Sequence, residues 1–294
     1  MNKVIGFIGL GIMGEAMAAN LIKKSGCKVI VYDIIPEKIE VLTKLGGKKA
    51  SSVEQLSADS DIIITMVPAS KQTIEVYENI LKGLRKNALC INMSTIEPDT
   101  HLKIVDLVEQ KQANILDAPV VKSKAAAIEG KLGIYVGGRE ECFAEALPIL
   151  SCMGEQIKYM GGHGKGLYMK ICHNMLVAAI QNGVNEMMVL ASKAGLALEK
   201  VIPAVSMGGG QNAYLDTKGD MILNENFEPA FSVLNMHKDI HIAKQIAQAY
   251  ELVLPALDIS TDIYDQAVEK YASRLEYVHL KDFRAAKEAN EPDG

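Results

Sequence analysis

A lysine stands in a long apolar segment where its amine could move a proton, and an asparagine follows four positions later. Lys170 and Asn174 would share one face of the helix that the periodicity of residues 167–194 predicts. An unpaired ammonium is costly to bury, so Lys170 must find a partner or line a cavity. In a cavity, desolvation would lower the pKa of Lys170 toward the range that general acid/base catalysis uses. The competing interpretation is a lysine whose amine reaches solvent near the start of the helix.

Three histidines in the C-terminal half could also take part in chemistry. His173 could donate to a substrate oxygen, but the more common role of such a ring is to satisfy a backbone carbonyl. His237 and His241 have the spacing of two metal ligands on one helix face. Because Lys238 lies between them and no carboxylate is apparent as a third ligand, we expect no metal site.

A turn with three glycines follows the first apolar run of the chain, residues 4–8, at the spacing G-x-G-x-x-G. Gly9 would allow the tight turn, Gly11 would let the backbone approach a pyrophosphate, and Gly14 would let the next helix lie close to the sheet. The N-terminus of that helix would point its free N–H groups and positive dipole end at the phosphates. The predicted dinucleotide-binding turn consists of Gly9, Leu10, Gly11, Ile12, Met13 and Gly14.

An acidic residue ends the second apolar run and predicts which dinucleotide binds. Asp33 follows residues 28–32 and lies nineteen positions after Gly14. Its carboxylate would accept hydrogen bonds from the adenosine ribose hydroxyls and would repel a 2′-phosphate. The sequence therefore predicts NAD rather than NADP as the cofactor. A βα turn in a flavodoxin-like domain without a nucleotide is the alternative.

Hydroxyls and cations stand at the ends of two other predicted strands, where ligands bind in parallel sheets. Ser94 and Thr95 could bond a nicotinamide carboxamide or a substrate, or could cap the next helix. Lys122 and Ser123 could hold the anionic head of a substrate, or could belong to a surface turn. Lys238 would be a solvated partner of the acid beside it, or a cation that reaches the nicotinamide end of the cofactor.

The composition is typical of a soluble globular protein with an ample core. Of the 294 residues, 49% are hydrophobic and 23% are charged. The formal charge of −5 includes no basic block, so nucleic acid is not an expected partner. The five cysteines show no C-x-x-C spacing, which favours reduced thiols in a cytoplasmic protein over disulfides or a zinc site. The sequence contains no uninterrupted run of about 18 apolar residues, so we expect no membrane span.

Alternating strand and helix signals up to about residue 160 predict an α/β fold, with a Rossmann-type doubly wound parallel sheet at residues 1–162. Beyond this point the strand signals stop, and residues 163–294 are predicted to form an all-α domain for substrate binding and dimerisation. This domain would begin with a long interdomain helix at about 165–194, which is apolar nearly all round. The expected strands are residues 4–8, 28–32, 61–67, 88–93, 114–117 and 132–136, and the expected later helices are about 232–250 and 256–272.

Four stretches, in order, resemble the β-hydroxyacid dehydrogenase family over nearly the whole chain. This family includes 3-hydroxyisobutyrate dehydrogenase and tartronate semialdehyde reductase, and 6-phosphogluconate dehydrogenase is a larger relative. Four motifs in the same order are more specific than any one of them. The stretches are G-F-I-G-L-G-I-M-G at residues 6–14, N-M-S-T-I-E-P at 92–98, G-K-G at 164–166 followed by Lys170 and Asn174, and H-K-D at 237–239.

The resemblance implies a role for several single residues. In the family, the lysine that matches Lys170 is the general acid/base, and the asparagine that matches Asn174 orients the substrate. The lysine that matches Lys238 approaches the cofactor. The threonine that matches Thr95 contacts the nicotinamide end, and the residue that matches Val67 lies against the cofactor.

The substrate loop departs from the family's usual D-A-P-V-S-G-G, because residues 117–123 read D-A-P-V-V-K-S. Val121 cannot donate the side-chain hydrogen bond of the serine that it replaces. The loop is more similar to that of sulfolactaldehyde reductase, in which an arginine and a threonine grip a sulfonate. Lys122 and Ser123 fall at those two positions.

Taken together, these features predict an NAD-dependent oxidoreductase that passes a hydride between the nicotinamide and a small anionic β-hydroxy acid or its semialdehyde. One alternative is a sulfolactaldehyde reductase-type enzyme, a second is a non-catalytic dinucleotide-sensing protein, and a third is an imine reductase. The apolar α-domain suggests a homodimer or homotetramer. The expected catalytic residues are Lys170 and Asn174, and the expected substrate-binding residues are Ser94, Lys122, Ser123 and His173.

Overall fold

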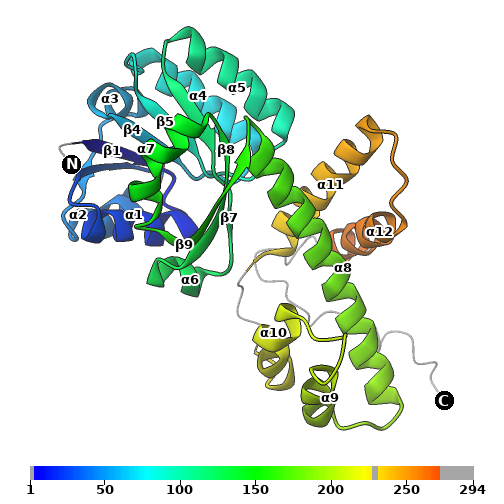
Figure 1. Ribbon diagram of the computed structural model, residues 1–294. Helices are drawn as coiled ribbons and strands as arrows, with labels where there is room; N and C mark the ends of the chain where they lie inside the picture. The colour runs from blue at the N-terminus through cyan, green and yellow to red at the C-terminus, as the bar shows by residue number, and fades with distance from the viewer. Residues whose placement is uncertain (1–2, 227–230, 272–294) are drawn as a thin grey trace. The chain divides into compact units, whose positions relative to one another are not determined.

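The computed structural model describes residues 3–226 and 231–271 of the chain. The chain divides into two compact units, Met1–Lys170 and Ile171–Gly294. The long helix α8 (Lys165–Lys193), drawn in green in Figure 1, begins in the first unit and continues through the second.

The first unit is built on a mainly parallel sheet with the strand order β3-β2-β1-β4-β5-β6-β8-β7, and β9 pairs with β8. From β1 the chain first adds strands on one side, through β2 to β3, and then crosses over to add β4 and β5 on the other. This is the doubly wound arrangement, in which ligands bind at the carboxyl ends of the strands beside the switch point. The strands are β1 (Val4–Ile8), β2 (Lys28–Tyr32), β3 (Lys48–Lys49), β4 (Ile62–Thr65), β5 (Leu89–Asn92), β6 (Asn114–Asp117), β7 (Val120–Val121), β8 (Leu132–Gly138) and β9 (Gly154–Gly161).

Helices cover both faces of this sheet, because its central strands are apolar at consecutive positions. On β4, Ile62 and Ile64 join one buried cluster and Ile63 joins the other. The first cluster is completed by α1, α2, α6 and α7, and the second by α3, α4 and α5 (Figure 1). The helices are α1 (Ile12–Lys24), α2 (Pro36–Thr43), α3 (Val53–Asp59), α4 (Ser70–Gly83), α5 (Pro98–Gln110), α6 (Lys124–Glu129) and α7 (Glu140–Leu150).

The expected α/β fold class is confirmed. Each predicted strand corresponds to an observed one, and its ends differ from the observed ends by at most two residues. The sequence did not reveal β3, β7 or β9. Strand β9 carries exposed Glu155, Gln156 and Lys158, so it has no continuous apolar run. Strand β8 also pairs in antiparallel fashion with β6 and β7, so the sheet is mixed at this end rather than parallel throughout.

The described part of the second unit is helical, as predicted. The first half of α8 contributes Ile171 and Ala178 to a buried cluster with α11 and α12, and its second half contributes Val184 and Met188 to a cluster with α9 and α10. The helices predicted at about 232–250 and 256–272 correspond to α11 and α12. The bounds are α9 (Leu198–Val205), α10 (Ala213–Leu223), α11 (Val233–Ala249) and α12 (Pro255–Tyr271).

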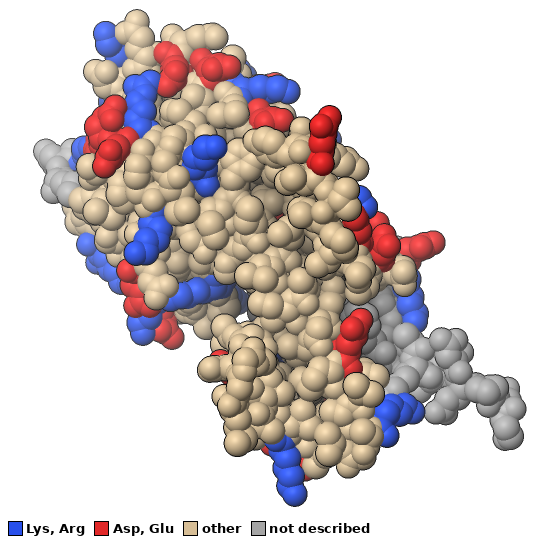
Figure 2. Space-filling view, turned by 45° about the vertical axis from the view of Figure 1, so that its right-hand side comes forward, with Lys and Arg blue, Asp and Glu red and all other residues tan. Residues whose placement is uncertain are grey.

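The surface carries charges of both signs. On the face of the first unit drawn in Figure 2, Lys and Arg side chains are interspersed with Asp and Glu side chains. Within the described ranges, no helix combines the length and the apolar character that a membrane crossing needs.

Candidate active site

The glycine turn between β1 and α1 has the backbone that a dinucleotide needs. Gly9 has a φ of +95°, and a Cβ there would meet the Met66 carbonyl oxygen at 2.3 Å. A Cβ on Gly14 would meet the Gly9 carbonyl oxygen at 2.0 Å, so the helix packs closely on the turn. A Cβ on Gly11, by contrast, would meet no atom within 4 Å. Gly11 caps α1 without a side-chain bond, so the turn fits a phosphate group over the helix N-terminus.

Asp33 fixes this turn from the end of β2. One carboxylate oxygen accepts a hydrogen bond from the Leu10 N–H at 2.6 Å, and the other accepts one from the Ile35 N–H at 2.8 Å. Each carboxylate oxygen has a second lone pair, so these bonds leave capacity to accept from ribose hydroxyls. The structure therefore gives Asp33 a structural task beside its predicted cofactor contact, which stays a prediction.

Val67 and Ser94 are joined at the carboxyl ends of β4 and β5. The hydroxyl of Ser94 accepts a hydrogen bond from the Val67 N–H at 2.9 Å, and the Asn92 side chain accepts one from the Ser94 N–H at 3.1 Å. Ser94 is fully buried, whereas Thr95 is partly exposed. The hydroxyl of Ser94 thus positions the backbone at Val67, and its predicted substrate contact stays a prediction.

The substrate loop holds Lys122 in an unusual conformation. Lys122 has a φ of +82°, in the left-handed region that favours glycine, which is the residue that the family usually has at this position. Its ammonium donates to Glu155 of β9 at 3.0 Å, and both side chains are substantially exposed. Ser123 is the N-cap residue of α6 but makes no side-chain capping bond. An anion at this loop would therefore compete with Glu155 for the charge of Lys122.

Sequence reasoning missed the residue that anchors the start of α8. Asp117, at the end of β6, accepts hydrogen bonds from the Gly164 N–H and the Leu167 N–H, both at 2.8 Å, and is fully buried. A Cβ on Gly166 would lie 2.9 Å from its carboxylate, so the glycine allows this close approach. A negative charge at a helix N-terminus is favourable. This anchor fixes the turn of α8 immediately before Lys170.

A neutral histidine shares this buried site. Nε2 of His101, on α5, lies 3.5 Å from the nearer oxygen of Asp117. Burial lowers the pKa of His101 to about 4, and the opposing pull of the Asp117 charge is smaller. The imidazole is therefore neutral at pH 7, and the contact is polar rather than an ion pair. Among the described residues, neither ring nitrogen has a hydrogen-bond partner.

In the second unit, Asp239 links two predicted site residues. Its carboxylate accepts a hydrogen bond from the Asn174 amide at 2.6 Å and one from the Lys238 ammonium at 2.8 Å. Asp239 is only 2% exposed and lies with Met236 and Ile240 on the buried face of α11. A solvated lysine–acid pair, one of the two interpretations of Lys238, does not fit a carboxylate that is this deeply buried, and the contact of Lys238 with the cofactor stays a prediction. The buried carboxylate orients the Asn174 amide and lies next to the cation.

Two further predicted residues lie on the same helix as Asn174. Lys170 is 7% exposed and Asn174 is 4% exposed, so the interpretation of Lys170 as a lysine that reaches solvent is not supported. His173 is partly buried. Lys170 ends the first unit, and Asn174 lies one helical turn later in the second.

Two family models together cover most of the chain. The NAD-binding domain of 6-phosphogluconate dehydrogenase matches residues 4–161, and the model described as NAD-binding of NADP-dependent 3-hydroxyisobutyrate dehydrogenase matches residues 164–282. The chain belongs to the β-hydroxyacid dehydrogenase family. As a member of this family it is an oxidoreductase that acts on a CH–OH group and uses a nicotinamide dinucleotide.

Individual relatives of known name cover nearly the whole chain. The mitochondrial 3-hydroxyisobutyrate dehydrogenase of Rattus norvegicus is 35% identical over 93% of this chain and 84% of its own length. The 2-hydroxy-3-oxopropionate reductase of Escherichia coli is 33% identical over 94% of this chain and 95% of its own length. A structure of Mycobacterium tuberculosis 3-hydroxyisobutyrate dehydrogenase with L-serine matches with a TM-score of 0.86 and 29% identity. The match covers 95% of this chain and 96% of that one. The chain therefore shares its fold with this structure over nearly its whole length.

Proposed function

We propose that this protein is an NAD-dependent dehydrogenase or reductase for a small anionic β-hydroxy acid or its semialdehyde, with Lys170 as the general acid/base. The observation that carries the proposal is a buried lysine on α8, one turn after the anchor that Asp117 provides. A buried amine in a family of hydroxyacid dehydrogenases has the chemistry to exchange a proton with a hydroxyl group.

The chain's own residues supply position and a proton. During oxidation, Nζ of Lys170 takes the proton of the substrate hydroxyl as the alcohol becomes a carbonyl; during reduction, the same ammonium returns a proton to the carbonyl oxygen. Asn174, oriented by Asp239, donates its remaining amide N–H to the reacting oxygen. A nicotinamide dinucleotide, when bound, would supply the chemistry of hydride transfer.

The choice of NAD over NADP rests on Asp33. A 2′-phosphate beside this carboxylate would bring two like charges together, whereas a ribose hydroxyl would donate to it. The contact between Asp33 and the Leu10 N–H holds the carboxylate at the edge of the glycine turn, which supports this role.

The proposal assigns the substrate's anionic head to Lys122 and Ser123, with His173 and Ser94 as further contacts. The left-handed backbone of Lys122 favours the alternative of a sulfolactaldehyde reductase-type enzyme, because a lysine held at a glycine position indicates a task for its side chain. In that case the anion is a sulfonate rather than a carboxylate.

We further propose that the protein forms a homodimer or homotetramer in the cytoplasm. The proposal is supported by the exposed apolar side chains of Leu176, Val189 and Leu190 on α8, which contact with a second copy of the chain would bury.

The decisive experiment replaces Lys170 by alanine. We expect kcat to fall about 10²–10⁴-fold, the range attributed to a positioned acid/base. The dissociation constant of NADH, measured by fluorescence titration, should stay unchanged. Lys165→Ala removes an exposed lysine from the same helix and should leave turnover near normal. The assay uses NADH and NADPH in parallel, with short aldehydes that carry a carboxylate, a sulfonate or a phosphate. Near-normal turnover of Lys170→Ala would remove this lysine from the role, and a preference for NADPH would contradict the argument from Asp33.

A further inference from the structure

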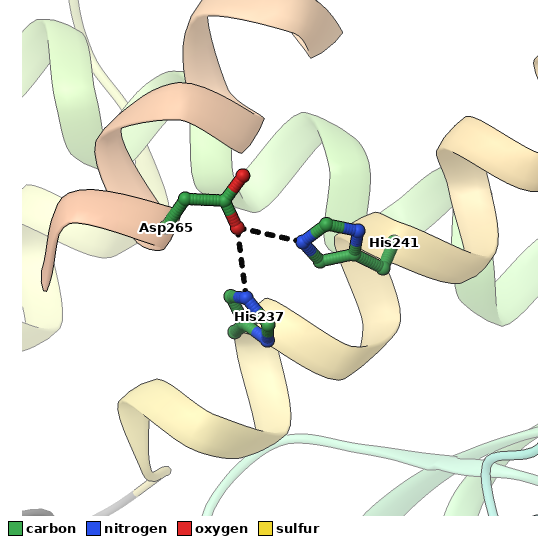
Figure 3. A group of neighbouring side chains, drawn as sticks. All are labelled: His237, His241 and Asp265. Atoms are coloured by element: carbon green, nitrogen blue, oxygen red, sulfur yellow. Dashed lines mark hydrogen bonds and ion pairs between the residues drawn. The ribbon is translucent and has the colours of Figure 1, made fainter. Parts of the chain in front are cut away.

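Two histidines and one aspartate of the second unit meet at one point between α11 and α12 (Figure 3). Nε2 of His237 lies 2.8 Å from Oδ1 of Asp265, and Nε2 of His241 lies 2.7 Å from the same oxygen. The imidazole rings are tilted against each other with their centroids 4.3 Å apart. The three ligand atoms all lie within 4.8 Å of one another. Two nitrogen ligands and a carboxylate oxygen therefore converge on one small volume.

Helix packing explains why the sequence did not reveal the third member. The four-residue spacing of His237 and His241 predicts that both lie on one face of α11, and they do. Asp265 follows Tyr264, which belongs to the same buried cluster as Ile240 of α11. The contact between the two helices thus supplies the carboxylate whose apparent absence led us to expect no metal site.

We propose that His237, His241 and Asp265 bind a divalent transition-metal ion, and that Zn²⁺ suits this set of ligands best. Two imidazoles and one carboxylate are ligands that Zn²⁺ takes in tetrahedral sites, with a water in the fourth position. Bonds of about 2.0–2.2 Å put tetrahedral ligand atoms about 3.3–3.6 Å apart, so each nitrogen needs to move away from the oxygen by about 0.5–0.9 Å.

The surroundings permit this adjustment. The side chains of His237, His241 and Asp265 are 28%, 40% and 46% exposed, which gives them room to move and gives an ion a path from solvent. Lys238 stands between the two histidines in the sequence, but its ammonium donates to Asp239, so its charge is already compensated. A bound ion would connect α11 to α12 and would stiffen the helix that carries Lys238 and Asp239.

The experiment uses the untagged, full-length protein after its metals have been removed with EDTA. Titration with Co²⁺ should give one visible absorption band that saturates at one ion per chain, and Zn²⁺ should displace it. Adding Zn²⁺ should also raise the melting temperature by several degrees, because an ion that binds only the folded chain stabilises it. Neither readout depends on catalytic activity.

Variants separate this site from other metal-binding groups. His241→Gln and Asp265→Asn should each weaken Co²⁺ binding at least tenfold and abolish the Zn²⁺-dependent rise in melting temperature. If one of these variants does not fold, His237→Gln is tested in its place. Asp262→Asn changes an exposed acid on α12, and Cys172→Ser removes an exposed thiol, so both should bind Co²⁺ normally. The proposal is overturned if the wild-type protein shows no saturable binding of either ion, or if the site variants bind as tightly as the wild type.

Discussion

Replacing Asp117 by asparagine tests whether one buried carboxylate holds the start of the helix that carries Lys170. The native side chain accepts from two backbone N–H groups of the α8 N-terminus, Gly164 and Leu167, each at 2.8 Å. An asparagine has a single acceptor oxygen and carries two amide hydrogens in place of the second one. It can therefore satisfy only one of the two N–H groups, and its own amide would face the other.

The size of the effect follows from these contacts. A hydrogen bond to a charged group contributes about 1.5–3 kcal/mol, and a buried donor left without a partner costs about 1–3 kcal/mol. The neutral amide avoids the desolvation of a carboxylate that is fully buried, which offsets part of this loss. We therefore expect Asp117→Asn to lower the free energy of unfolding by about 2–4 kcal/mol. A first turn of α8 that frays would also displace Lys170, and a misplacement of about 1 Å can cost about 10²-fold in rate.

Urea unfolding followed by circular dichroism measures the first effect, and kcat with an accepted substrate measures the second. Asp106→Asn, the same change at an exposed position of α5, is the matched control and should lie within about 0.5 kcal/mol of the wild type. NADH binding should be unchanged in both variants, because Asp117 is not part of the glycine turn. A loss of stability below about 0.5 kcal/mol in Asp117→Asn, with normal kcat, would refute the anchoring role.

Two further predictions concern His101 and Lys122. The pKa of His101 is about 4 in the folded protein and near 6.5 in the unfolded chain, so the unfolded state binds the extra proton first and stability is lost as the pH falls from 6.5 toward 4. When the pH is lowered from 7 to 4.5, the free energy of unfolding measured with urea should fall by about 2 kcal/mol more for the wild type than for His101→Gln. An equal fall in the two proteins would contradict this prediction. Lys122→Gly relieves the left-handed backbone and removes the cation, so KM for the anionic substrate should rise about 10–100-fold without any loss of stability. An unchanged KM would exclude Lys122 from substrate binding, and Lys124→Ala, at the neighbouring cation, is the control.

The sequence was most informative where the signal is local. The glycine turn at residues 9–14 is confined to six residues, and the apolar strands β1 and β2 need no distant partner to be recognised. Helix α8 was predicted at about 165–194 and observed at Lys165–Lys193, because its apolar character extends over its whole length. Strand β9 was missed for the opposite reason, since a strand with exposed polar residues becomes visible only when its partner β8 is known.

Three carboxylates show what local patterns cannot reveal. Asp117 binds the backbone 47 and 50 positions further along the chain, Asp239 binds an amide 65 positions before it, and Asp265 lies beside histidines 24 and 28 positions before it. From sequence alone, an acidic residue is interpreted as a solvated charge unless its partner is known. Each of these partners lies outside the helix or strand that carries the acid. In all three cases the acid fixes a group that matters for the proposed chemistry: the helix before Lys170, the amide of Asn174 and a candidate metal site. The residue types of the proposed active site could thus be predicted from sequence, whereas the acids that position or accompany them depend on how the helices pack.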